Sequence, residues 1–134
     1  MARMYPARIR DATKSQAERK LYDVLREGLP NDYAVFHSVA WLARDPRSGA
    51  QDGEADFVVA HPTRGVLVIE VKGGRILYDG ALGQWYSGPY AIQDPFEQAR
   101  GNKYSLLAKV KDLPYWRNRW SWSARPEALS DQFR

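Results

Sequence analysis

Apolar residues recur at two different periods along this chain, and the two periods predict helices and strands in different places. The first periodic segment follows the helical spacing of three and four residues, with apolar positions at Ala17, Leu21, Val24 and Leu25. It begins after Ser15, which precedes Glu18 by three residues in the pattern of a capping box. Gly28 follows its last turn, as is typical of a helix end. We therefore expect a helix over residues 15–28.

Three later segments are rich in β-branched and aromatic residues, which is typical of strands: Tyr33–Ala43, Glu54–Ala60 and Val66–Lys72. Turn-forming residues dominate Arg44–Gly53, which predicts a loop between the first two strands. The connection His61–Gly65 has a length that suits a hairpin. Two short outer strands are expected over residues 76–78 and 84–86.

The clearest helix start lies in the second half of the chain. Asp94 stands at the N-cap position, Pro95 at the first helical position and Glu97 at the third. Apolar residues extend this helix to about Lys111, and Pro114 ends it. Two helices and several strands predict an α/β fold, with a mixed central sheet against which both helices pack.

The remaining segments divide the 134-residue chain into three parts around one core. Residues 1–12 are basic and lack either period, so they are expected to form a mobile N-terminal arm. Residues 13–116 are expected to form the folded domain. Residues 117–134 are rich in Trp and Arg and show no clean period, so they are expected to form a divergent or truncated tail.

Composition narrows the chemistry. The chain has no cysteine and two histidines, which excludes a disulfide scaffold, a cysteine-zinc site and a histidine-rich metal site. A metal site would therefore consist mainly of oxygen ligands, which favours Mg²⁺ or Mn²⁺. The net charge of +4 permits a polyanionic partner without requiring one. No apolar run is long enough to span a membrane and the N-terminus does not resemble a secretory signal, so a cytoplasmic protein is expected.

Charged residues interrupt two of the expected strands in a way that suggests a site. Successive side chains of a strand alternate faces. One face should therefore carry Glu54, Asp56 and Val58, and the other should carry Ala55, Phe57 and Val59. If Ala60 pairs with Val66 across the hairpin, Asp56 lies opposite Glu70. By the same register, Glu54 lies opposite Lys72.

Opposed carboxylates are about 5 Å apart at Cβ and repel each other in a plain sheet. A Mg²⁺ ion between Asp56 and Glu70 would attract both carboxylates and so replace their repulsion by a net attraction. Such an ion could also activate a water toward a phosphodiester, with Lys72 beside it. The alternative is a ladder of surface ion pairs, each worth about 0–1 kcal/mol. Val66–Ile69 is apolar on both faces, which indicates a central, covered strand and modestly favours the site.

Four sequence blocks together resemble a known family: GEADFVV, VLVIEVKGG, GQW and DPFEQA. They resemble the nuclease-related domain, NERD, of the PD-(D/E)XK nuclease superfamily, from about Gln16 to Tyr115. The resemblance implies a restriction-endonuclease-like core in which Asp56 and Glu70 hold Mg²⁺ or Mn²⁺. It implies that Lys72 lies beside them and that Glu18 completes the acidic cluster. It also implies that Gln98 contacts the lysine, a water on the metal or the DNA backbone.

Simpler roles compete with the helical and histidine candidates. Glu18 could serve only to close the capping box with Ser15, and Gln98 could be an ordinary polar residue of a first helical turn. His37 alternates with aromatic strand residues and is expected to be structural. The superfamily continues into a further strand after the long helix, whereas SWSARPEALSDQFR has no strand pattern. The C-terminal strand is therefore expected to be missing or divergent, which leaves activity open.

The expected function is metal-dependent hydrolysis of nucleic acid, with DNA as the expected partner. The alternative is a weakly active or inactive module that binds nucleic acid or docks a partner, and homo-oligomerisation stays open. Basic residues would supply sequence-independent phosphate contacts. The candidates are Arg8, Arg10, Lys14, Arg44, Arg47, Arg100 and Lys103.

Overall fold

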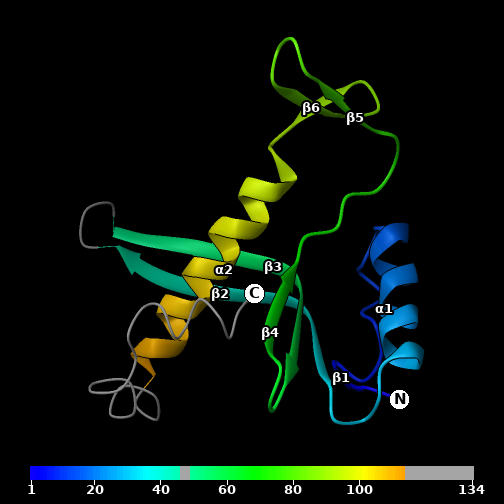
Figure 1. The fold of residues 1–134 in the computed structure, drawn as a ribbon, viewed down its shortest axis with the longest axis vertical. Coiled ribbons are helices and arrows are strands. Elements are labelled where there is room, and N and C mark those ends of the chain that lie inside the picture. The colour runs from blue at the N-terminus through cyan, green and yellow to red at the C-terminus, as the bar shows by residue number, and fades with distance from the viewer. Residues whose placement is uncertain (46–48, 114–134) are drawn as a thin grey trace.

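The computed structural model describes residues 1–45 and 49–113, and the side chains of residues 42–52 lie outside that description. Its elements follow one another in the order β1 (Arg3–Tyr5), α1 (Gln16–Gly28), β2 (Ala34–Asp45), β3 (Gly49–His61), β4 (Gly65–Ile69), β5 (Ile76–Asp79), β6 (Gln84–Ser87), β7 (Tyr90–Ile92) and α2 (Pro95–Asp112). Figure 1 shows β2 and β3 as a long ribbon beside which α2 runs, with α1 on the other side of the strands. The tail 117–134 lies outside the described residues.

The main sheet is mixed, as the sequence predicts for an α/β fold. Its four strands lie in the order β1-β2-β3-β4, with β1 parallel to β2 and the other neighbours antiparallel. The predicted strands over 76–78 and 84–86 also form, but they build a second sheet with β7, which the pattern did not predict. They are therefore not outer strands of the main sheet. Figure 1 shows this small sheet beyond the N-terminal end of α2.

Both predicted helices are confirmed, together with their caps. Ser15 caps α1 by accepting the backbone N–H of Glu18 on its hydroxyl oxygen at 3.2 Å. Asp94 caps α2 by accepting the backbone N–H of Phe96 on its carboxylate at 2.9 Å. Each cap satisfies an N–H group that has no partner within its own helix. Within the described residues, neither helix is long and apolar enough to cross a membrane.

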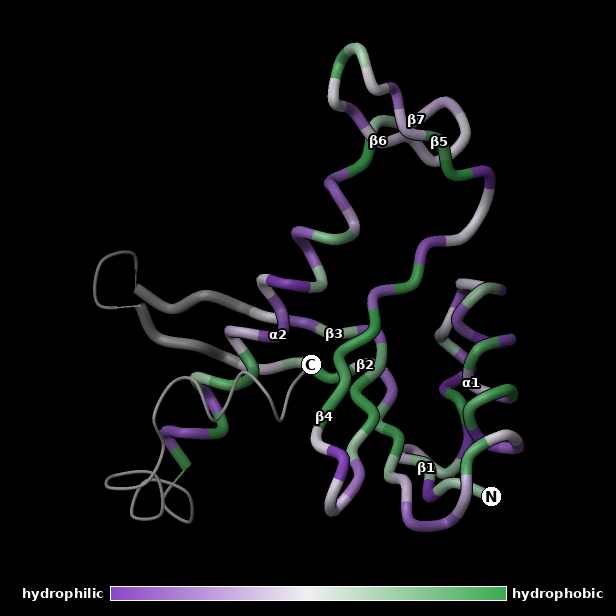
Figure 2. The backbone as a smooth tube through the Cα atoms, in the orientation of Figure 1, coloured by the Kyte–Doolittle hydropathy of each residue, from purple (hydrophilic) through white to green (hydrophobic). Residues whose placement is uncertain are grey.

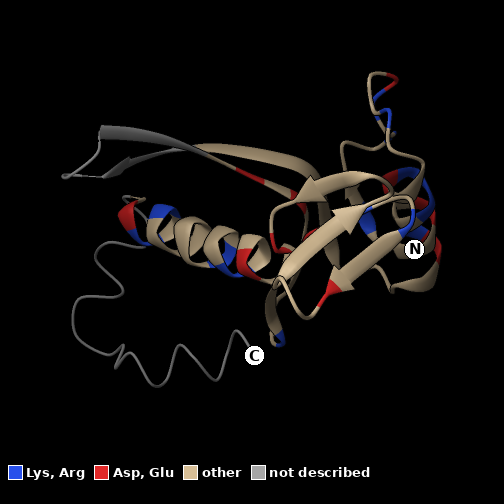
Figure 3. Cartoon of the chain, turned by 90° about the horizontal axis from the view of Figure 1, so that it is seen from above, with Lys and Arg blue, Asp and Glu red and all other residues tan. Residues whose placement is uncertain are grey.

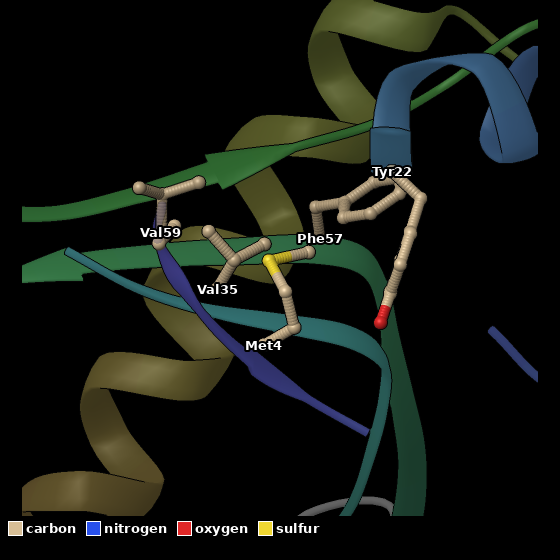
Figure 4. Packing of buried hydrophobic residues seen from close by; sticks show 6 residues of the cluster. Met4, Tyr22, Val35, Phe57 and Val59 are labelled. Carbon is tan, nitrogen blue, oxygen red and sulfur yellow. The ribbon is translucent and has the colours of Figure 1, made fainter. Parts of the chain in front are cut away.

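The prediction of a mobile arm over residues 1–12 is wrong for its first half, because that segment is part of the fold. Residues 3–5 form β1, and Ala2 and Met4 are buried in the core. Backbone hydrogen bonds hold the segment, since the N–H of Ala2 donates to the carbonyl of Arg26 at 3.0 Å. Figure 4 shows Met4 packed among Tyr22 and the valines of the central strands. A three-residue strand is too short to show a period, so only its pairing with β2 identifies it.

The prediction of a loop over Arg44–Gly53 is also wrong, because most of that segment is strand. The β2–β3 ladder continues from Trp41↔Gly53 to Asp45↔Gly49. Backbone groups form this ladder, so turn-prone residues can join it when the strands before them are already paired. The strands β2 and β3 are therefore longer than the composition of this segment indicates.

Two hydrophobic clusters lie on opposite faces of the main sheet. The first contains Val59 of β3 and packs against Leu21 and other residues of α1. The second contains Val58, the neighbour of Val59, and packs against Leu106 of α2. Since neighbouring residues of a strand point to opposite faces, α1 and α2 cover opposite faces. Figure 2 shows the apolar character of β2, β3 and β4 where they run between the two helices.

The expectation that Val66–Ile69 forms a central, covered strand is wrong. β4 lies last in the strand order of the main sheet among the described residues, and 57% of Leu67 is exposed. Its apolar pattern has a different cause. Val66 and Val68 pack against the second cluster and Ile69 packs against the first, so that this edge strand contributes to both. The strand ends at Ile69, three residues before the predicted end.

Candidate active site

The predicted register between β3 and β4 is confirmed. Ala60 pairs with Val66, and the ladder continues to Phe57↔Ile69. The next positions along the ladder are Asp56 and Glu70, where regular pairing stops. The carboxylate Oδ2 of Asp56 instead accepts the backbone N–H of Val71 at 2.7 Å. Asp56 thereby fixes the direction in which the chain Glu70–Lys72 leaves the sheet.

A distortion in β2 lies directly across from Asp56. Ser38 occupies the register position opposite Asp56, yet it has a φ of 55°, which is the left-handed conformation that a serine rarely adopts. On one side of it, His37 and Phe57 are paired and Phe57 belongs to the cluster under α1. On the other side, Val39 and Ala55 are paired, but they pack in the cluster on the α2 face. Phe57 and Ala55 are two residues apart on β3, so a regular strand would place them on one face, but they pack on opposite faces of the sheet.

This change of face corrects the predicted alternation. Ala55 does not share a face with Phe57 and Val59, but instead packs in the same cluster as Val58. The left-handed residue rotates the strand pair where the ladder is interrupted, and Asp56 is the β3 residue at that point. Backbone strain of this kind costs about 1–3 kcal/mol and persists where surrounding structure imposes it. Here it leaves the Asp56 side chain half-buried, between the two packed faces.

The Asp56 carboxyl is electrostatically the most perturbed group of the site. Burial raises its pKa, the backbone N–H of Val71 opposes that change, and the nearby carboxylates of Glu70 and Glu18 raise the pKa further, to about 6. Lys72 lowers it by a smaller amount. These influences place the charges of Glu18 on α1 and of the segment Glu70–Lys72 after β4 within electrostatic reach of Asp56. The role of these four residues in one site stays a prediction.

Glu70 and Lys72 form an ion pair in which Nζ lies 3.0 Å from Oε1. The Glu70 side chain is 7% exposed and that of Lys72 is 27% exposed, so the acid is buried and the base reaches the surface. The expected pairing of Glu54 with Lys72 is wrong, because β4 ends before Lys72 and the lysine turns to Glu70. The exposed Glu54 carboxylate instead accepts the Ser38 hydroxyl at 3.4 Å.

Glu18 reaches the site from α1. The capping box that could account for it is only half formed, since Ser15 accepts the Glu18 N–H while the Glu18 carboxylate points elsewhere. Its Oε2 lies 2.7 Å from Nε2 of His37 on β2. An ionised carboxylate only accepts hydrogen bonds, so the histidine Nε2 carries the proton and donates it. The pattern of the strand indicated a structural role for His37 and gave no sign of this contact.

Gln98 lies on the first turn of α2, as predicted. Its backbone N–H donates to the carbonyl of Asp94 at 3.0 Å, which is a normal helical bond. Its side-chain Oε1 is buried and has no hydrogen-bond partner among the described residues. A buried acceptor of this kind usually has a partner, so the position is suited to a polar ligand group. The contact of Gln98 with lysine, water or DNA stays a prediction.

The carboxylates fit a hard cation by charge. Asp56 and Glu70 are oxygen donors whose mutual repulsion helps to raise the pKa of Asp56, and a divalent ion would relieve that repulsion. Within residues 1–45 and 49–113, however, no group of three or more His, Cys, Asp or Glu side chains is arranged to hold a metal ion. The donor set that fits is therefore the pair, and the participation of Glu18 stays a prediction.

Comparison with known proteins identifies one family. The model of the nuclease-related domain, NERD, matches residues 13–120. The match includes the five residues predicted for the site: Glu18, Asp56, Glu70, Lys72 and Gln98. No curated protein and no solved structure matches the chain.

Proposed function

This chain belongs to the NERD family of nuclease-related domains, within the PD-(D/E)XK nuclease superfamily, and we propose that it hydrolyses phosphodiester bonds of nucleic acid, with DNA as the expected substrate. One observation carries this proposal. Asp56 and the segment Glu70–Lys72 lie where β4 ends. Lys72 Nζ is 3.0 Å from Glu70 Oε1. Burial and the carboxylates of Glu70 and Glu18 raise the pKa of Asp56. A surface ladder of ion pairs would not bury Glu70 or desolvate Asp56.

We propose that Asp56 and Glu70 hold a Mg²⁺ or Mn²⁺ ion. When bound, such an ion neutralises charge on a phosphate and lowers the pKa of a water. The protein prepares for it by burying Glu70 and by fixing Asp56 through the N–H of Val71. Without the ion, burial and the negative charges of Glu70 and Glu18 raise the pKa of Asp56. The positive charge of Lys72 offsets only a small part of this effect.

Lys72 would act on the substrate side. Its ammonium group is partly exposed, so it can reach a phosphate oxygen while its stem stays beside Glu70. A fixed cation at this place would stabilise negative charge that develops on the phosphate during cleavage. Gln98, whose Oε1 has no partner among the described residues, would accept a hydrogen bond from the water or from Lys72.

Phosphate contacts would come from the basic surface. Figure 3 shows Lys and Arg interspersed with Asp and Glu on both helices, so neither helix is uniformly basic. Arg100 lies 3.8 Å from Glu97, and the Lys103 ammonium lies 4.7 Å from the centre of the Tyr104 ring. Both ends can turn to a phosphate at small cost, since they are held by weak surface contacts. Arg44 and Arg47 lie among the residues whose side chains are outside the description.

A second candidate function is a binding module with weak or no cleavage. The ion pair between Lys72 and Glu70 favours it, because that contact occupies one of the two donors of the proposed metal site. So does the lack of a three-carboxylate group among the described residues. In this case the same surface would bind nucleic acid or a partner without hydrolysis.

Cleavage of supercoiled and linear DNA with Mg²⁺, Mn²⁺ or EDTA distinguishes the two functions. Asp56→Ala and Lys72→Ala should each lower the cleavage rate by roughly 100-fold or more, which is the usual loss when a charge-stabilising group is removed. Asp11→Ala and Lys20→Ala are matched controls, because both residues are exposed and make the same charge changes. They should leave the rate unchanged.

Each outcome of this experiment points to one function. DNA binding without cleavage in any metal would favour the module. Cleavage that survives both site variants would contradict the assignment of the site and point to another part of the chain. An equal loss of cleavage in the two control variants would show that the net charge of the chain, rather than the site, sets the rate.

A further inference from the structure

One buried side chain beside the proposed site has no role in the function described so far. His37 on β2 is 3% exposed, and the centre of its ring lies 4.7 Å from the centre of the Phe57 ring and 6.0 Å from that of Tyr22, with which it makes a T-shaped pair. Its Nδ1 has no hydrogen-bond partner among the described residues, so Glu18 is the polar contact that its Nε2–H makes. A plain packing position would suit an apolar ring, because burying an imidazole costs free energy unless both nitrogens are satisfied.

The hydrogen bond between His37 and Glu18 determines which of two positions the Glu18 carboxylate takes. Glu18 stands three residues after the N-cap Ser15, where a glutamate side chain ordinarily turns back to the backbone N–H of the cap residue. The first half of that box is present, since Ser15 accepts the Glu18 N–H. The second half is not, because the carboxylate lies 2.7 Å from His37. The histidine therefore competes with the helix end for the same carboxylate.

The place that the carboxylate takes matters to the site. Its charge acts on Asp56 from α1, so Glu18 contributes to the negative potential that would attract a cation. A charge-assisted hydrogen bond in a buried setting is short and strong, and holds one rotamer of the glutamate. His37 lies on the α1 face, where it contacts Glu18 and Tyr22, and the left-handed Ser38 follows it directly in the chain.

We propose that His37 is a positioning residue, whose Nε2–H holds the Glu18 carboxylate beside Asp56 and away from the cap of α1. The inference rests on the proposed nuclease function for its consequence, but its structural part stands independently of cleavage. Outer residues that orient a metal-binding carboxylate typically change metal affinity or activity by about 10–100-fold when they are lost.

Four variants test it: His37→Phe, His37→Gln, Glu18→Gln and the double variant of His37→Phe with Glu18→Gln. Phenylalanine keeps a ring against Phe57 and removes the donor, whereas glutamine keeps an N–H donor. Mn²⁺ affinity by calorimetry, the DNA cleavage rate and the crystal structure are the measurements, with thermal unfolding as a check of folding. If His37→Phe does not fold, His37→Met replaces it as the apolar variant.

His37→Phe should weaken Mn²⁺ binding and cleavage by about 10–100-fold, as Glu18→Gln should. The double variant should be no weaker than Glu18→Gln alone, because the histidine acts through the glutamate. His37→Gln should recover most of the loss. In the His37→Phe crystal, the Glu18 carboxylate should lie against the Ser15 N–H.

Two results would overturn the inference. The first is that His37→Phe lowers Mn²⁺ affinity and cleavage by the same factor in the wild-type chain and in the Glu18→Gln chain. That would mean that His37 matters for packing alone. The second is a His37→Phe crystal in which Glu18 has not moved. If the wild-type chain neither cleaves DNA nor binds Mn²⁺, the proposed function fails, and the crystal structure still decides whether His37 positions Glu18.

Discussion

At the scale of single residues, Asp56 shows what the site costs the fold. Desolvation and the carboxylates of Glu70 and Glu18 raise its pKa to about 6, against 3.8 for an ordinary aspartate. The folded protein therefore holds this proton more tightly than the unfolded chain does. The ionised carboxylate destabilises the folded state above about pH 6, and this penalty disappears as the pH falls to about 4.

Asp56→Asn should therefore stabilise the metal-free protein. Asparagine can still accept the Val71 N–H, but it removes the charge that Glu70 and Glu18 repel. In urea unfolding with EDTA at pH 7.5, we expect a gain of roughly 1–2 kcal/mol after allowance for partial exposure of the group. The gain should vanish near pH 4.

The control is Asp11→Asn, an exposed aspartate for which no change is expected at either pH. A loss of stability in Asp56→Asn at pH 7.5 would contradict the electrostatic account. It would mean that the hydrogen bond to Val71 outweighs the repulsion from the neighbouring carboxylates. The variant should at the same time lose cleavage, so stability and activity should change in opposite directions.

At the scale of elements, β1 is a strand that the composition of the N-terminal segment does not predict. Three residues of a basic segment pair in parallel with β2 and close one edge of the main sheet. The hydroxyl of Tyr22 on α1 donates to the carbonyl of Pro6 at 2.6 Å, which ties the chain after β1 to the helix. The strand, the helix and β2 therefore share one core, in which Met4 and Val35 are buried together.

Two methionines near the N-terminus test this role of β1. Met4 is 9% exposed and Met1 is 76% exposed, so the two differ in burial but not in chemistry. Met4→Ala should lower the free energy of unfolding by about 2–3 kcal/mol, because it leaves a cavity in the cluster under α1. Met1→Ala should change it by less than about 0.5 kcal/mol. Equal, small effects in urea unfolding would restore the view of a mobile arm.

At the scale of the whole molecule, the two sheets differ in how they are held. The main sheet carries both hydrophobic clusters, whereas none of the residues described in β5, β6 and β7 is buried. The small sheet is joined to the rest through contacts such as those of Trp85 with Phe96 and of the Ser87 hydroxyl with the Gly73 carbonyl. It begins four residues after Lys72.

Hydrogen exchange should resolve this difference within one chain. Amides of β6 are paired on both sides, as are those of β3, so both should be protected by hydrogen bonds. Because the small sheet buries little, it should open locally, and we expect its amides to exchange at least about tenfold faster than those of β3 around Phe57. Equal exchange of β6 and β3 would instead show that both sheets unfold in one step.

Local patterns were sufficient for much of this molecule. The two helices and their caps follow from short-range periodicity and from side chains within three residues, so the sequence predicted them closely. The pairing of Ala60 with Val66 follows from hairpin length, and it brings Asp56 to the end of the ladder near Glu70. The approach of Asp56 to Glu70 was thus predictable from the sequence, because one tight turn determines it, whereas the pairing of Lys72 with Glu70 in place of Glu54 was not.

Contacts between distant segments decided the rest. No local period predicts three features of the fold: the pairing of β1 with β2, the change of face at Ser38, and the hydrogen bond from His37 to Glu18. Their free energies depend on packing of the whole core, which can impose a left-handed serine or a buried histidine against local preference. The sequence alone determined that Asp56 and Glu70 lie at the end of one ladder, because a short hairpin sets that register. The tertiary structure decided which other charged groups approach them, because those contacts join distant segments.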